Sequence, residues 1–118
     1  MDSDDGLGKL SAALAEFVEE RDWDQFHNPK NLAMALAAEA GELLEHFQWL
    51  SESEANSLGA SQRQEVAMEM ADILMFLLRL ADRLQVDLLK AADEKLELNR
   101  RRYPVEKARG RATKYDKL

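Results

Sequence analysis

The stretch VAMEMADILMFLL, Val66–Leu78, is the longest apolar-rich run of the 118-residue chain, and two acids, Glu69 and Asp72, interrupt it. It is too short to cross a bilayer, which needs about 20 apolar residues. The run lies inside a longer helical pattern, from about Gln62 to Leu84, that is apolar nearly all round in its middle. A helix of this kind is buried on most sides. We therefore expect it to be the most buried element of the fold.

Three further segments carry apolar residues three and four positions apart, which is helical spacing. The chain has only two prolines and five glycines, and residues that favour helices dominate it. We predict an all-α fold with a four-helix, bundle-like core. The three segments are Leu7–Glu20, Asn28 or Asn31 to about Leu50, and Val86 to about Arg101. Between them we expect a loop over Arg21–Pro29 and a polar surface connection over Ser51–Ser61.

Composition narrows the possible functions. The net charge of −7 argues against a nucleic acid polymer as partner, because such binding depends on clustered lysine and arginine. The absence of cysteine excludes disulfides, zinc–thiolate sites and thiol catalysis. The start, Met1–Gly6, is acidic where a secretory signal would be basic and then apolar. We predict a cytoplasmic protein without a membrane segment, with one domain over residues 1–118 that ends in a basic tail, residues 105–118.

Two of the predicted helices carry an acidic pair three residues apart: Glu39 with Glu42, and Glu69 with Asp72. On a helical wheel of about 100° per residue, Glu39 borders the apolar stripe of its helix and Glu69 lies among apolar residues. An unpaired buried carboxylate costs several kcal/mol. No lysine or arginine lies between Val66 and Leu78 to pair with these acids. They must be protonated, paired with cations from elsewhere, or bound to metal.

A metal site is the interpretation that both pairs favour together. If the two helices are antiparallel neighbours, the four carboxylates converge on one point. Oxygen ligands suit Mg²⁺, or Mn²⁺, better than zinc or copper. Such an ion would let an acidic protein hold a triphosphate. For either pair alone, a solvated helix face is the more frequent explanation.

These residues stand in a pattern that resembles a known family. The spacing Glu39-x-x-Glu42, 26 residues, then Glu69-x-x-Asp72 is similar to the signature of the MazG-like, all-α nucleoside triphosphate pyrophosphohydrolases. The sequence segments around these acids resemble the dCTP pyrophosphatase branch of that family, and the similarity spans Leu10 to Tyr115. The segments are ERDWDQFHNPKNLAMALAAEAGELLEHFQW (20–49), EMADILMF (69–76), KLELNRRRYP (95–104) and ARGRATKY (108–115).

The resemblance implies an enzyme. It implies a four-helix core that assembles through its helices as a dimer or a dimer of dimers. It also implies Mg²⁺ held by catalytic carboxylates and cleavage of a (deoxy)nucleoside triphosphate, dCTP or a modified dCTP first, to the monophosphate and pyrophosphate. The four carboxylates are Glu39, Glu42, Glu69 and Asp72. The preference among dCTP, its modified forms, dUTP and dTTP stays open, as does which acid activates water, with Glu42 favoured.

The resemblance also implies a nucleotide pocket. Its members would be Trp23, Asp24, Gln25, Phe26, His27 and Trp49, with the ring at position 76 against the sugar. Two departures from the family pattern occur, because Leu14 stands where a histidine is expected and Phe76 where a tyrosine is expected. Trp23 and Trp49 are the only tryptophans and flank the acidic edge of the second helix, although each could equally be a core or interface anchor. Candidates for phosphate contacts are Lys30, Asn31, Lys95, Asn99, Arg102, Tyr103, Arg109 and Lys114, each of which could equally be a solvated surface group.

Two rival functions remain open at this point. A di-iron carboxylate bundle would need Glu-x-x-His motifs, and no glutamate in the chain has a histidine three residues later. A non-catalytic helical interaction module would use the acids as surface groups and the tryptophans as anchors for a partner.

Overall fold

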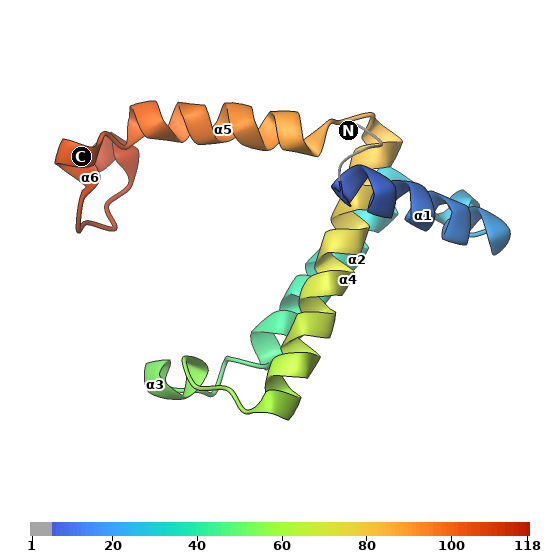
Figure 1. Ribbon diagram of the computed structural model, residues 1–118, viewed down its shortest axis with the longest axis horizontal. Helices are drawn as coiled ribbons and strands as arrows, with labels where there is room; N and C mark the ends of the chain where they lie inside the picture. The colour runs from blue at the N-terminus through green and yellow to red at the C-terminus, as the bar shows by residue number, and fades with distance from the viewer. Residues whose placement is uncertain (1–5) are drawn as a thin grey trace. The chain divides into compact units, whose positions relative to one another are not determined.

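The computed structural model describes residues 6–118, and within that range it contains helices and turns and no strand (Figure 1). The prediction of an all-α fold is confirmed. The elements are α1 (Gly6–Glu20), η1 (Asp24–Phe26), α2 (Pro29–Glu45), α3 (Glu52–Ala55), α4 (Ala60–Leu84), α5 (Leu88–Arg102), α6 (Val105–Ala108) and η2 (Tyr115–Lys117). Among the described residues, no helix is both long enough and apolar enough to span a lipid bilayer. Most of the acidic start, residues 1–5, lies outside the described range.

The chain divides into two compact units, which we describe separately: a first unit that ends at Val86 and a second unit over residues 87–118. In the first unit, α2 and α4 run antiparallel and pack along each other, as the short connection between them predicts (Figure 1). Helix α1 also packs on α4. The single domain over residues 1–118 stays a prediction.

Helix α2 begins where the sequence predicts a cap. Asn28 has extended backbone and its side-chain oxygen accepts a hydrogen bond from the backbone N–H of Asn31 at 2.9 Å. Pro29 follows at the first helical position, where a missing N–H costs nothing. Of the two asparagines that could cap this helix, Asn28 is therefore the one that does so.

The core of the first unit is small and centred on α4. Its apolar members are Val18 from α1, Leu32 from α2, and Val66, Leu78 and Ala81 from α4. Helix α4 has more buried residues than any other described helix, as predicted. Burial does not extend all round it in the single chain, however, because Met68 and Met70 are more than half exposed.

Two boundaries differ from the prediction. Helix α2 ends at Glu45 and not near Leu50, because the N–H groups of His46 and Phe47 bond to carbonyls three residues back, which tightens the last turn. The polar connection over Ser51–Ser61 contains α3. There Ser51 and Glu54 form a capping box: the Ser51 hydroxyl accepts from the Glu54 N–H, and the Glu54 carboxylate accepts from the Ser51 N–H.

The second unit consists of α5 and the segment after it. Asp87 caps α5 by accepting from the Lys90 N–H, and the helix ends at Arg102 as expected from the following Tyr103 and Pro104. The predicted basic tail contains α6 and η2. The Tyr115 ring meets the edge of Tyr103 at 6.0 Å between centroids and lies 4.4 Å from the Arg102 guanidinium carbon. These contacts fold the tail back onto the end of α5.

Candidate active site

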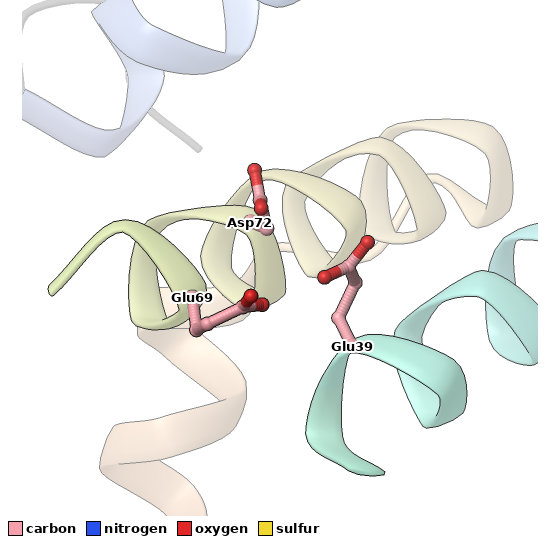
Figure 2. Close-up of side chains that lie close together, drawn as sticks. All are labelled: Glu39, Glu69 and Asp72. Atoms are coloured by element: carbon pink, nitrogen blue, oxygen red, sulfur yellow. The ribbon is translucent and has the colours of Figure 1, made fainter. Parts of the chain in front are cut away.

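Three carboxylates from two helices meet in the first unit. One oxygen from each of Glu39, Glu69 and Asp72 lies within 4.8 Å of the other two. Figure 2 shows Glu39 reaching from α2 toward the two acids of α4. Their spacing explains this arrangement, because residues three apart share one face of a helix and the antiparallel packing of α2 and α4 brings Glu39 opposite that face.

The fourth predicted acid, Glu42, lies at the edge of this group. Its side chain is exposed and close enough to hydrogen-bond Glu39, but it does not belong to the group of three whose oxygens meet. We call Glu39, Glu69 and Asp72 the carboxylate cluster.

The carboxylate cluster is chemically incomplete by itself. Among residues 6–118, Oε2 of Glu39 and Oε2 of Glu69 are buried side-chain oxygens that no hydrogen-bond donor reaches. A buried charged oxygen without a partner costs free energy. A hard divalent cation such as Mg²⁺ or Mn²⁺ takes carboxylate oxygens as ligands. The residues present therefore fit a metal ion of this class.

The environment of the cluster already favours protonation of one acid. Burial raises the pKa of Glu39 from 4.5 to about 7, helped by hydrogen bonding with Glu42 and Glu69 and by the negative charges of Glu42 and Asp72. Proximity of like charges and desolvation both favour the neutral acid. A cation bound at the same place would favour the charged form instead, because an opposite charge close to a carboxylate lowers its pKa.

Binding of a divalent cation is therefore expected to depend on pH. The ligand must be deprotonated, so affinity for Mn²⁺ should rise about tenfold between pH 6 and pH 8, with about one proton released at the lower pH. Isothermal titration calorimetry in two buffers of different ionisation enthalpy measures both quantities. An affinity that does not change over this range would contradict the prediction.

The raised pKa of Glu39 also determines in which direction the stability of the metal-free protein changes with pH. Because the pKa of Glu39 in the fold exceeds its usual value, its contribution to the free energy of unfolding is fully present below pH 4.5 and is lost as the pH rises through about 7. The metal-free protein should therefore lose this contribution in the range where cation binding strengthens.

A pocket of about 510 Å³ adjoins the cluster and shares Asp72 with it. Its walls are almost wholly apolar and come from α1, the loop after it, and α4. Three of the residues predicted to meet the nucleotide line it: Trp23, His27 and Phe76. Leu14 also lines it, so both departures from the family pattern are at the wall of this pocket. The remaining lining residues include Leu10, Phe17, Val18, Met75 and Arg79.

The other predicted residues of the loop hold it in shape and are not among the lining residues. The Gln25 amide donates to the carboxylate and the carbonyl of Asp22 at 3.0 Å each. The Asn31 amide donates to the carbonyl of Phe26 at 3.0 Å. Asp24 accepts hydrogen bonds from Arg79 and Arg83 of α4.

Comparison with known proteins decides the family. The sequence profile of the MazG-like family matches residues 34–118. The chain belongs to the MazG-like family. It is 48% identical over 106 residues to dCTP pyrophosphatase 1 of Homo sapiens and 50% identical over 118 residues to dCTP pyrophosphatase 1 of Bos taurus. These matches cover 88% and 98% of this chain, which spans 62% and 70% of those two proteins.

The fold is also shared with a solved structure. A pyrophosphatase from Archaeoglobus fulgidus matches with a TM-score of 0.81 and 37% sequence identity, over 88% of this chain and 97% of that one. The fold of this MazG-like chain is therefore similar to that of a known pyrophosphatase. The sequence profile is that of the family which the acidic spacing resembles.

Several predicted contacts of this MazG-like chain lie outside the pocket. Trp49 follows α2 and is 85% exposed. Lys30 is exposed in the first turn of α2. The other predicted phosphate contacts belong to the second unit, and their roles stay predictions. They are Lys95, Asn99, Arg102, Tyr103, Arg109 and Lys114.

Arg79, which was not among the predicted site residues, lines the pocket and is only 4% exposed. It is the one charged residue among the buried positions of residues 6–118. A signal was present, because Arg79 stands three residues after Phe76 and seven after Asp72, which is helical spacing for the same face.

Proposed function

We propose that the chain is a magnesium-dependent nucleoside triphosphate pyrophosphohydrolase. It would convert dCTP, or a modified dCTP, to the monophosphate and pyrophosphate by cleavage between the α and β phosphates. The observation that carries the proposal is the carboxylate cluster beside an apolar pocket, with Asp72 common to both. The name shared by the two mammalian relatives, dCTP pyrophosphatase 1, supports the same substrate.

The carboxylate cluster and Glu42 have separate roles in the proposed reaction. Glu39, Glu69 and Asp72 would hold Mg²⁺, with Glu42 close beside them. A bound divalent cation offsets the charge of the triphosphate and of the leaving pyrophosphate and polarises water. Glu42 is exposed at the edge of the cluster, where an acid can take a proton from the attacking water. We assign that role to Glu42.

The pocket would hold the nucleoside part of the substrate. Trp23 and Phe76 offer aromatic faces, and Trp23 is itself held edge-on against Phe17, with 5.7 Å between ring centroids. Stacking of a base on an aromatic ring is worth about 1–3 kcal/mol. Because Leu14 and Phe76 add no polar group to the wall, the neutral hydrogen-bonding groups that a base would meet there are the His27 imidazole and the indole N–H of Trp23.

We further propose that the chain assembles as a dimer or a dimer of dimers. Large apolar side chains are exposed on both helices that carry the cluster, and monomeric proteins rarely leave such faces open to water. They include Met34 and Leu44 on α2 and Met68, Met70 and Leu74 on α4. Trp49 would be covered in the assembly. Trp49, Lys95, Asn99 and Tyr103 were predicted to contact the nucleotide. Whether they do so would then have to be measured in the assembled protein.

A substrate panel tests the proposed function. The protein is incubated with dCTP, 5-methyl-dCTP, dUTP, dTTP and dATP in the presence of Mg²⁺, and monophosphate, pyrophosphate and single phosphate are measured separately. We expect monophosphate and pyrophosphate in equal amounts, fastest from a cytosine nucleotide, and no product after chelation of the metal. Release of single phosphate would contradict the cleavage position. No turnover of any nucleotide would favour the alternative, a non-catalytic helical interaction module.

A further inference from the structure

Arg79 makes three polar contacts from a nearly buried position on α4. Its Nη2 donates to Oδ1 of Asp24 at 3.1 Å, its Nη1 to Oδ2 of Asp82 at 3.0 Å, and its Nε to Nδ1 of His27 at 3.4 Å. Arg83, one turn later, donates to both oxygens of Asp24 at 2.9 and 3.1 Å. We call these five residues the Arg79 network.

We propose that Arg79 is a positioning residue for the nucleotide pocket and that it acts through His27. By donating to Nδ1, it fixes the His27 ring as the tautomer with its proton on Nε2. His27 then meets the base as a hydrogen-bond donor. This inference rests on the proposed function for its substrate, but not for the tautomer itself.

The tautomer follows from what arginine can do. A guanidinium has only donors, so a ring nitrogen that approaches Nε of Arg79 must be the unprotonated one. In a neutral imidazole the proton is then on Nε2. A doubly protonated ring would set Nδ1–H against the N–H of Arg79. Burial lowers the pKa of His27, and the charges of Arg79 and Arg83 lower it further while Asp24 opposes them. The ring is therefore held neutral.

The network also holds the ring in place. The loop that carries Asp24 and His27 is joined to α4 across more than 50 residues of sequence by the contacts of Arg79. By contrast, the loop bonds from Trp23 to Val18 and from Asn31 to Phe26 each span only five residues. Arg79 thus connects the wall formed by the loop to the wall formed by α4.

The consequence concerns which bases the pocket accepts. Apart from the indole N–H of Trp23, the polar groups of its lining side chains belong to Asp72, His27 and Arg79. Each of the three nitrogens of the Arg79 guanidinium donates one hydrogen bond within the Arg79 network. A neutral histidine with Nε2–H satisfies a base that presents an acceptor, such as the O2 or N3 of cytosine. An amino group placed against Nε2–H of His27 would leave that hydrogen bond unmade, and a buried polar group left unpaired disfavours a ligand. The nucleotide that fits is one whose base places a carbonyl oxygen or an unprotonated ring nitrogen, and not an amino group, against His27.

Removal of Arg79 should leave the fold intact, which makes the proposal testable. Asp24 and Asp82 have side chains that are 52% and 44% exposed, so both carboxylates stay hydrated without Arg79. Asp24 also keeps Arg83. Replacing a buried charge by an apolar side chain of similar length is often neutral when no buried partner is orphaned. We therefore choose Arg79→Met, with Arg79→Lys as the variant that keeps the charge but lacks the planar fork.

The first measurement needs no substrate. Long-range ¹H–¹⁵N correlation spectra of the imidazole rings report the tautomer, and His46, the only other histidine, serves as an internal reference. We expect His27 of the unmodified protein to carry its proton on Nε2 at pH 7, and Arg79→Met to show a mixture of tautomers. A His27 ring protonated on Nδ1 in the unmodified protein would overturn the proposal without any variant.

The second measurement is the division between KM and kcat for dCTP with Mg²⁺. Arg79→Met should raise KM about tenfold with kcat changed by less than about threefold, and Mn²⁺ affinity should stay the same. In the double variant, Arg79→Met should raise KM less than about threefold above the value for His27→Ala alone, because both changes remove the same contact. Arg100→Met, which removes an exposed arginine from a pair with Glu97 on α5, is the matched control and should change neither parameter.

Failure of this inference and failure of the proposed function are distinguishable. If no nucleotide is hydrolysed, the proposed function fails, and the NMR arm still decides the tautomer. If dCTP is hydrolysed but the increases in KM caused by Arg79→Met and His27→Ala multiply in full in the double variant, Arg79 does not act through His27 and the inference is wrong. An Arg79→Met variant with the Nε2–H tautomer and an unchanged KM would also refute it.

Discussion

Glu69→Gln is expected to lower kcat for dCTP about 1000-fold and to weaken Mn²⁺ binding to the point where calorimetry detects no saturation. The change keeps the shape of the side chain but replaces a charged ligand oxygen by an amide in a site where two buried oxygens already lack partners. Metal ions supply several kcal/mol of charge stabilisation in such reactions, and about 1.4 kcal/mol is a factor of ten. Steady-state kinetics and titration calorimetry are the measurements.

The same variant should not weaken the metal-free fold. Loss of one negative charge relieves repulsion within the carboxylate cluster, so the melting temperature without metal should stay the same or rise. Glu65→Gln, on an exposed position of the same helix, is the matched control and should keep full activity. A Glu69→Gln variant that retains both turnover and metal binding would show that Glu69 is not a metal ligand. It would support the alternative, a helical interaction module in which the acids are surface groups.

Leu78→Ala is expected to cost about 3 kcal/mol in the free energy of unfolding, because this side chain, in the C-terminal half of α4, is fully buried. A loss of that size in a chain of this length corresponds to a fall of about 10 °C in the melting temperature. Urea unfolding followed by circular dichroism measures it. Leu84→Ala, on the same helix but 53% exposed, is the control and should cost about 1 kcal/mol or less. An equal loss at the two positions would contradict the burial seen in the single chain.

Much of the site could be predicted because it depends on short, regular spacing. Glu69 and Asp72 share a face of α4 by helical geometry alone, and the short connection after α2 implies the antiparallel packing that brings Glu39 to them. The sequence offered Asn28 or Asn31 as the cap of α2, and the structure shows that Asn28 is the cap. These features need no information from distant parts of the chain.

Other features depend on contacts that spacing does not encode. Helix α2 ends at Glu45 because the backbone changes to bonds three residues back, although the apolar spacing continues to Phe47. The capping box of Ser51 and Glu54 matches the Ser-x-x-Glu pattern, but no apolar run follows it to indicate a helix. Arg79 could not be assigned a partner, since Asp24 lies 55 residues away in sequence.

The hydrogen bonds of Asp24 with Arg79 and Arg83 of α4 also limit which segments of this protein can be exchanged with those of relatives. Transplanting residues 21–28 into another member of the family would move the aromatic and imidazole groups without their anchor on the neighbouring helix. The smallest transferable module is therefore the loop together with the turn of α4 that contains Arg79, Asp82 and Arg83. Recombination between relatives that separates the two segments would produce chimaeras in which the loop and its support come from different ancestors.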